Sequence, residues 1–126
     1  MKLEYLADGS PDCPILRLYD FTPAEAGQLA DAASALAAGA VKRVDLHLLP
    51  FVQAVGACRL ALIRQTWDQA VVRGTEPNEF TCGYTPGTWE NVVKLVEPFA
   101  AGAAEFQWLA GAPGQAALLL STSGQW

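Results

Sequence analysis

The sequence predicts an α+β domain built from two similar ββαββ-like halves. A Thr-Pro motif occurs twice at a spacing of 63 residues, first in Phe21-Thr22-Pro23 and again in Tyr84-Thr85-Pro86. An Ala-Ala-Gly-Ala motif recurs at the same spacing, and short runs of aliphatic residues flank both copies. We therefore expect a mainly antiparallel sheet, two helices packed on one side of it, and a pseudo-twofold relation between the halves.

Composition limits the classes of protein to which the chain can belong. Of its 126 residues, 52% are hydrophobic and 17% charged, which is too apolar for intrinsic disorder. No apolar run is long enough to span a membrane, and the first residues lack the apolar segment of a signal peptide. A net charge of −5 disfavours nucleic acid and anionic lipid as partners. We expect one cytoplasmic domain over 1–126, with its internal repeat at approximately 1–64 and 65–126.

In the first half, the residues around the Thr-Pro motif predict a helix with defined ends. Thr22 is suited to cap the helix, Pro23 to occupy its first position, and Glu25 to complete a capping box. Gly39 then provides the left-handed residue that often ends a helix. The strands expected around this helix cover 1–7, 15–19, 41–48 and 59–63.

The second half repeats this order with small differences. Thr85 is the expected cap, but Thr88 stands where the first half has glutamate, so the capping box should be weaker. Pro98 should end or kink the helix near its last turn, and Gly102 follows it. The strands expected here cover 67–73, 80–84, 105–110 and 116–120.

The two helices should bury matching faces. The first face comprises Ala26, Leu29, Ala30, Ala33 and Leu36, and residues 63 positions later are Trp89, Val92, Val93, Val96 and Phe99, all apolar. Residues 58–73 are ambiguous, because they contain no Gly or Pro and also fit a helical face. We interpret them as a β-hairpin, since the second half ends in a similar apolar run, polar turn and tryptophan.

The halves differ most in the connection before their last strand. The first half uses the long, mostly apolar segment 49–57, whereas the second uses the short turn 111–114. An apolar loop either packs over the core or presents a patch to a partner. In the second case the Leu48–Val55 segment, with Phe51 in it, would bind another protein or form a homodimer.

Few residues suggest catalysis. His47 is the sole histidine, and on a strand it would share a face with Asp45, which could orient the imidazole. The alternative is a partly exposed histidine beside a solvated carboxylate, and we favour it because general acid–base sites need further converging groups. The cysteines, Cys13, Cys58 and Cys82, have no paired spacing, which favours free thiols and predicts neither a disulfide framework nor zinc.

The chain lacks a glycine-rich phosphate loop and a nucleophile elbow. We therefore favour a non-enzymatic binding protein, such as an accessory, inhibitor or immunity-type partner of another protein, with no cofactor and no metal. The alternative is a small-molecule-binding protein or minor enzyme whose cleft lies between the halves and uses Asp45 and His47. The candidate binding residues are Asp45, His47, Phe51, Arg59, Arg64, Trp108 and Trp126.

Overall fold

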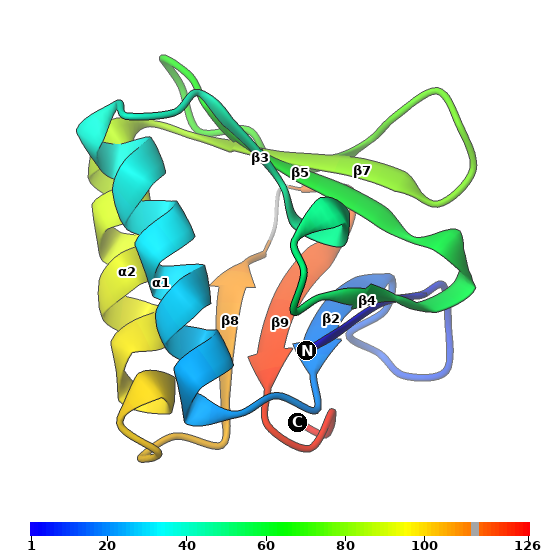
Figure 1. Ribbon diagram of the computed structural model, residues 1–126. Coiled ribbons are helices and arrows are strands. Elements are labelled where there is room, and N and C mark those ends of the chain that lie inside the picture. Colours follow the sequence, from blue (N-terminus) through cyan, green and yellow to red (C-terminus); the bar gives the residue numbers. More distant parts are fainter. Residues whose placement is uncertain (112–113) are drawn as a thin grey trace.

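The computed structural model, which describes residues 1–111 and 114–126, has an α+β fold in which two adjacent helices cover one side of two sheets (Figure 1). The helices are α1 (Pro23–Ala38) and α2 (Pro86–Ala100), with the short 3-10 helices η1 (Leu46–Leu48) and η2 (Val55–Ala57). The strands are β1 (Lys2–Leu6), β2 (Ile15–Tyr19), β3 (Arg43–Asp45), β4 (Gln53–Ala54), β5 (Arg59–Arg64), β6 (Ala70–Arg73), β7 (Glu79–Tyr84), β8 (Phe106–Ala110) and β9 (Ala117–Ser121).

Each sheet takes strands from both halves of the chain. The first, sheet A, has the order β4-β1-β2-β9-β8, and the second, sheet B, has the order β3-β5-β7-β6. β9, from the end of the chain, lies parallel to β2. β5, from the first half, lies parallel to β7 in the second. β1 and β4 are also parallel, whereas the pairs β1–β2, β8–β9, β3–β5 and β6–β7 are antiparallel, so the sheets are mixed but largely antiparallel. Each half completes the sheet of the other.

The prediction of a β-hairpin over 58–73 is wrong, because its two strands do not pair with each other. Both strands exist, and no helix forms there. However, β7 lies between β5 and β6, parallel to the first and antiparallel to the second. β6 turns back onto β7 through residues 74–78, so the strand that follows β5 in sequence is not its neighbour in the sheet.

Two other predicted strands are shorter than expected. The strand over 41–48 is reduced to β3, because Leu46 turns into the core with 0% exposure and begins the 3-10 helix η1. The strand over 67–73 is reduced to β6, since Asp68 instead contacts the first turn of α2.

The helices have the ends and the buried faces that the sequence predicts. Thr22 accepts the N–H of Glu25 at 3.2 Å, and Glu25 Oε1 accepts the N–H of Thr22 at 2.9 Å, which completes the capping box. Gly39 has a φ of 80°. α2 ends at Ala100, shortly after Pro98. Every expected apolar residue on the two helices is buried except Val93, which is partly buried against the core.

The start of α2 uses an acceptor from outside the helix. Thr85 accepts the N–H of Thr88 at 3.4 Å, as expected. Asp68 accepts the N–H of Thr85 at 2.9 Å and the hydroxyl of Thr88 at 2.7 Å. A loop carboxylate thus performs in α2 the role that Glu25 performs in α1.

Equivalent backbone hydrogen bonds end the two helices, at the predicted spacing of 63 residues. The N–H of Gly39 donates to the carbonyl of Leu36, and the N–H of Gly102, 63 residues later, donates to the carbonyl of Phe99. The turn 111–114 includes 112–113, which lie outside the described residues. The pseudo-twofold relation between whole halves stays a prediction.

Candidate functional site

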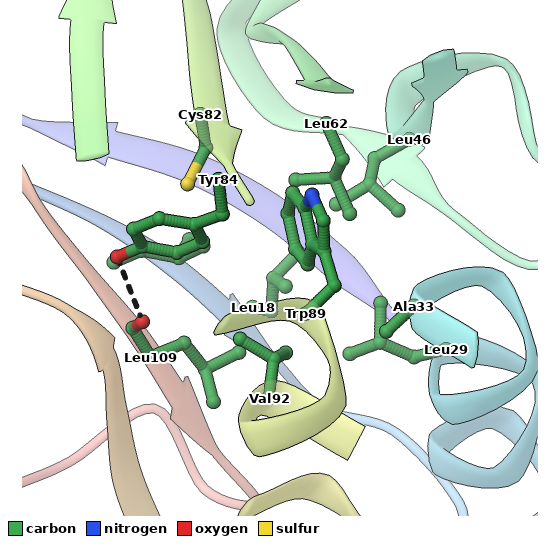
Figure 2. Close-up of a pocket in the computed structure, with 11 residues that line it drawn as sticks. Leu18, Leu29, Ala33, Leu46, Leu62, Cys82, Tyr84, Trp89, Val92 and Leu109 are labelled. Atoms are coloured by element: carbon green, nitrogen blue, oxygen red, sulfur yellow. Dashed lines mark hydrogen bonds between the residues drawn. The ribbon is translucent and has the colours of Figure 1, made fainter. Parts of the chain in front are cut away.

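The interior between helices and sheets holds one small apolar cavity, and its polar neighbours are satisfied (Figure 2). It measures about 10 Å³ and is lined by side chains from both halves, among them Leu18, Leu62 and Trp89. Tyr84 donates its hydroxyl to the carbonyl of Leu109 at 3.2 Å, and Trp89 Nε1 donates to the carbonyl of Ile63 at 3.0 Å. None of the seven candidate residues lines this cavity. This cavity is therefore part of the apolar core, and the cleft of the alternative hypothesis stays a prediction.

The thiols and the tyrosine hydroxyl of the interior are held in their neutral forms. Burial raises the pKa of the Cys82 thiol to about 12, and it does the same to Cys58. Burial also raises the pKa of Tyr84. All three cysteines are free and buried or partly buried, as the sequence predicts. A thiolate nucleophile at Cys82 is disfavoured by this environment.

His47 is attached to the backbone of β5. The N–H of Leu60 donates to its Nδ1 at 3.1 Å. The same Nδ1 lies 3.4 Å from the carbonyl of Leu60, and the shorter contact is the one in which Nδ1 accepts, which places the ring proton on Nε2. Asp45 is engaged elsewhere, because its Oδ1 accepts from Nε of Arg43 at 2.9 Å. The Asp45–His47 hydrogen bond that a catalytic histidine would need is not among the contacts of the described residues.

An open hollow on sheet B brings together two of the candidate residues, His47 and Arg59. Arg59 also forms an ion pair with Glu79 at 3.5 Å. We call this the histidine hollow; it measures about 180 Å³, and its lining comprises Arg43, His47, Arg59, Ala61, Glu79, Phe80 and Thr81. It contains donors and one carboxylate, but Nδ1 of His47 is bound to the backbone and Nε2 carries the ring proton, so the imidazole offers no acceptor toward a ligand.

A second hollow lies between β8 and the C-terminal tail and contains exposed aromatic rings. Phe106 is 47% exposed and Trp126 is 38% exposed. The ring of Trp126 meets that of Trp108 edge-on at 6.4 Å between centroids. We call it the aromatic hollow; it measures about 420 Å³, and its lining comprises Glu105, Phe106, Thr122, Ser123, Gln125 and Trp126.

Hydrogen bonds fix the tail that forms one wall of the aromatic hollow. Arg17 donates to the carbonyl of Gly124 at 2.8 Å. Ser121 donates its hydroxyl to the carbonyl of Gln125 at 2.6 Å, and Trp126 Nε1 donates to Asp12 Oδ2 at 2.8 Å. Trp126 is therefore held against the body of the protein while part of its ring faces solvent.

The remaining candidates lie in separate places. Phe51 is half-buried against the core, and Val52 beside it is buried, so this part of the apolar loop packs down as a lid. Leu48, at the start of the loop, is 72% exposed. Arg64 lines a third hollow, near the start of α2.

The structure brings some of the candidate residues together and separates others. Trp108 and Trp126 come into contact, and His47 and Arg59 share a hollow, whereas Arg64 and Phe51 lie elsewhere. Sequence reasoning missed Phe106. Phe106 could have been found from the alternation of side chains along a strand, which places residues two apart, such as Phe106 and Trp108, on the same face.

Comparisons with known proteins give no relative. No protein family, no curated protein and no solved structure matches the chain. Neither helix among residues 1–111 and 114–126 has both the length and the apolar character needed to cross a membrane.

Proposed function

We propose that this chain is a non-enzymatic binding protein that recognises another protein through the aromatic hollow. The observation that carries the proposal is the exposure of Phe106 and Trp126, which both line one open depression. Aromatic residues are enriched at the centres of protein interfaces, where they bury large areas. The fixed position of Trp126 lowers the entropic cost of binding, because its ring is already held by Asp12 and Trp108.

The charge of the hollow defines the partner more closely. Glu105 lines it, and Asp12 lies at the indole nitrogen of Trp126. A partner that inserts an apolar side chain between the rings, with a lysine or arginine beside it, would complement both features. An accessory, inhibitor or immunity-type role is consistent with such a surface.

A photo-crosslinking amino acid at position 106 tests this function in cells that express the protein. We expect one dominant crosslinked protein, identified by mass spectrometry, whose yield falls about tenfold or more with Trp126→Ala, as for an interface anchor. The matched control carries the crosslinker at Asp31, which is exposed on α1. Equal patterns at positions 106 and 31 would contradict the proposal.

A second copy of the chain is another partner to be distinguished. A homodimer through the Leu48–Val55 segment would use the exposed side chain of Leu48. Light scattering across a concentration series, with Leu48→Asp and Phe106→Asp compared, separates the two surfaces. A dimer lost only with Leu48→Asp would assign self-association to the loop. A monomer at every concentration leaves a different protein as the partner in the crosslinking experiment.

The histidine hollow favours a second candidate function, the binding of a small molecule. Arg43, Arg59 and His47 Nε2 would direct hydrogen-bond donors toward a polar ligand. Chemical shifts of the His47 ring, followed by NMR against a set of small carboxylates and amides, test this candidate. Saturable shifts that Arg59→Ala removes would support it, and an unchanged ring would reject it.

A further inference from the structure

A third hollow gathers positive charge at the end of the molecule where α2 begins. We call it the basic hollow; it measures about 470 Å³, and its lining comprises Lys42, Arg64, Gln65, Thr66, Thr85 and Pro86. The N–H of Arg64 donates to the carbonyl of Lys42 at 2.9 Å, so the backbone fixes these two cationic residues side by side. No carboxylate is part of the lining.

The two cationic residues of the basic hollow differ from most other cationic residues of the chain in that they form no ion pair among the described residues. Four cationic side chains form ion pairs, namely those of Lys2, Arg17, Arg43 and Arg59. Among the described residues, Lys42 and Arg64 have no carboxylate within ion-pairing distance. In a protein with a net charge of −5, the basic hollow therefore concentrates uncompensated positive charge at one point.

Arg64 has an unused donor. Its guanidinium packs against the end of α1, where a methyl group added to Gly39 would lie 3.2 Å from its terminal nitrogen. Within the described residues its Nε is buried and has no hydrogen-bond partner. Because this Nε is shielded from solvent, a ligand in the open hollow would be bound by the terminal nitrogens of the guanidinium, which lie beside Gly39.

The helix start contributes little to this charge. Asp68 already accepts the N–H of Thr85 and the hydroxyl of Thr88. Its carboxylate offsets the positive end of the α2 dipole. Attraction for an anion in the basic hollow thus depends on Lys42 and Arg64.

We propose that the basic hollow binds an oxyanion, a phosphate or carboxylate group carried by a small molecule. Arg64 provides the planar set of donors that suits two oxygens of one group, and Lys42 provides a second charge. This site is separate from the aromatic hollow and does not depend on the protein-binding function.

The other half has the opposite charge at the corresponding place. Residue 105, which lies 63 positions after Lys42, is Glu105, and it lines the aromatic hollow. The carbonyls of both residues accept a backbone N–H at the same kind of site, from Arg64 in one half and from Thr122 in the other. The aromatic hollow therefore serves as an internal comparison, which an anion should not enter.

NMR titration with inorganic phosphate and, separately, with acetate tests the proposal at constant ionic strength. The reporters are the Nε–H signal of Arg64 and the amide of Thr66. We expect saturable shifts with one anion at least, which assigns the phosphate or the carboxylate class. Lys42→Glu, which copies the charge of Glu105, should weaken binding about tenfold or more, as expected for a charged contact.

Lys94→Glu is the matched control, because Lys94 is exposed on α2 outside the basic hollow and the charge change is the same. Its titration should equal that of the unmodified protein. Linear shifts without saturation, equal shifts with chloride, or equal weakening by both lysine variants would overturn the proposal. Since Lys42 is exposed, its replacement leaves the fold intact, and the test does not require removal of Arg64.

Discussion

His47 takes the place of a backbone acceptor next to β3. The ladder between β3 and β5 ends at the pair of Asp45 and Ala61. The next donor on β5, the N–H of Leu60, finds the imidazole of His47 instead of a carbonyl. The single histidine of the chain thus extends a strand pairing that the 3-10 helix η1 would otherwise break.

Replacing His47 tests this structural role. His47→Ala should lower the free energy of unfolding by about 1–3 kcal/mol, because the N–H of Leu60 loses its acceptor. His47→Asn should recover most of the loss, since its amide oxygen can accept in place of Nδ1. Urea denaturation measures both. Equal stability of His47→Ala and the unmodified protein would contradict the role.

Gly39 and Gly102 give a matched pair at the ends of the helices. Both have positive φ, 80° and 72°, so alanine at either position should cost about 1 kcal/mol. Only Gly39 has a neighbour that a Cβ would crowd, the guanidinium of Arg64. Gly39→Ala should therefore destabilise more than Gly102→Ala in thermal unfolding. Equal melting temperatures would show that Arg64 moves aside without cost.

At the scale of elements, local chemistry determines the helices. Thr-Pro at each start, glycine after each end and apolar residues at helical spacing predicted both helices and their buried faces. These signals act over one or two turns, so they can be read from adjacent residues. Asp68 was not predicted as a helix cap, because its contact with Thr85 joins residues that are far apart in the sequence.

Asp68→Asn tests this distant cap. Hydrogen bonds from Thr85 and then Thr88 lower the pKa of Asp68 in the folded state. Its stabilisation is therefore complete above the pKa of the unfolded chain, about 3.9, and is lost as the pH falls through the lower folded pKa. The variant should be less stable by about 1 kcal/mol at pH 7, with the difference shrinking below about pH 4.

Chemical denaturation from pH 7 to pH 2.5 measures this difference. Asp31→Asn is the control, because Asp31 is exposed on α1 and lies outside both caps. A difference between Asp68→Asn and the unmodified protein that persists unchanged at the lowest pH would refute the ionic cap.

The strands could be located from the sequence, but their partners could not. Alternation and composition identified β5 and β6, yet nothing local specifies that β7 lies between them. The same limit applies to the candidate sites. Trp108 and Trp126 were identified as individual residues, but their contact depends on the path of the tail across sheet A. Asp45 and His47 would share a face on the predicted strand, but η1 forms there instead and each side chain bonds to a different partner.

At the scale of the whole molecule, the exchange of strands makes the halves interdependent. β2 has its parallel neighbour β9 from the other half, and β7 has β5. Removing either half would therefore expose the edge of a central strand and half of the shared apolar core.

Separate expression of residues 1–64 and 65–126 tests this interdependence. We expect each fragment alone to be unfolded or aggregated, since it lacks a central strand of its sheet. Diluting the two fragments together out of denaturant should restore the circular dichroism spectrum and the hydrogen-exchange protection of the intact chain. A stable, monomeric 1–64 fragment with native protection would contradict the expectation.

The position of β9 also determines when folding can finish during protein synthesis. β2 leaves the ribosome well before its parallel partner β9, because about a hundred residues separate the two strands in the sequence. Until β9 is made, the edge of β2 that β9 will cover stays exposed in the β1–β2 hairpin. Translation of the intervening hundred or so residues takes roughly 5–20 s at typical elongation rates. Nascent chains of this protein should accordingly depend on chaperones more than a fold with sequential strand order would.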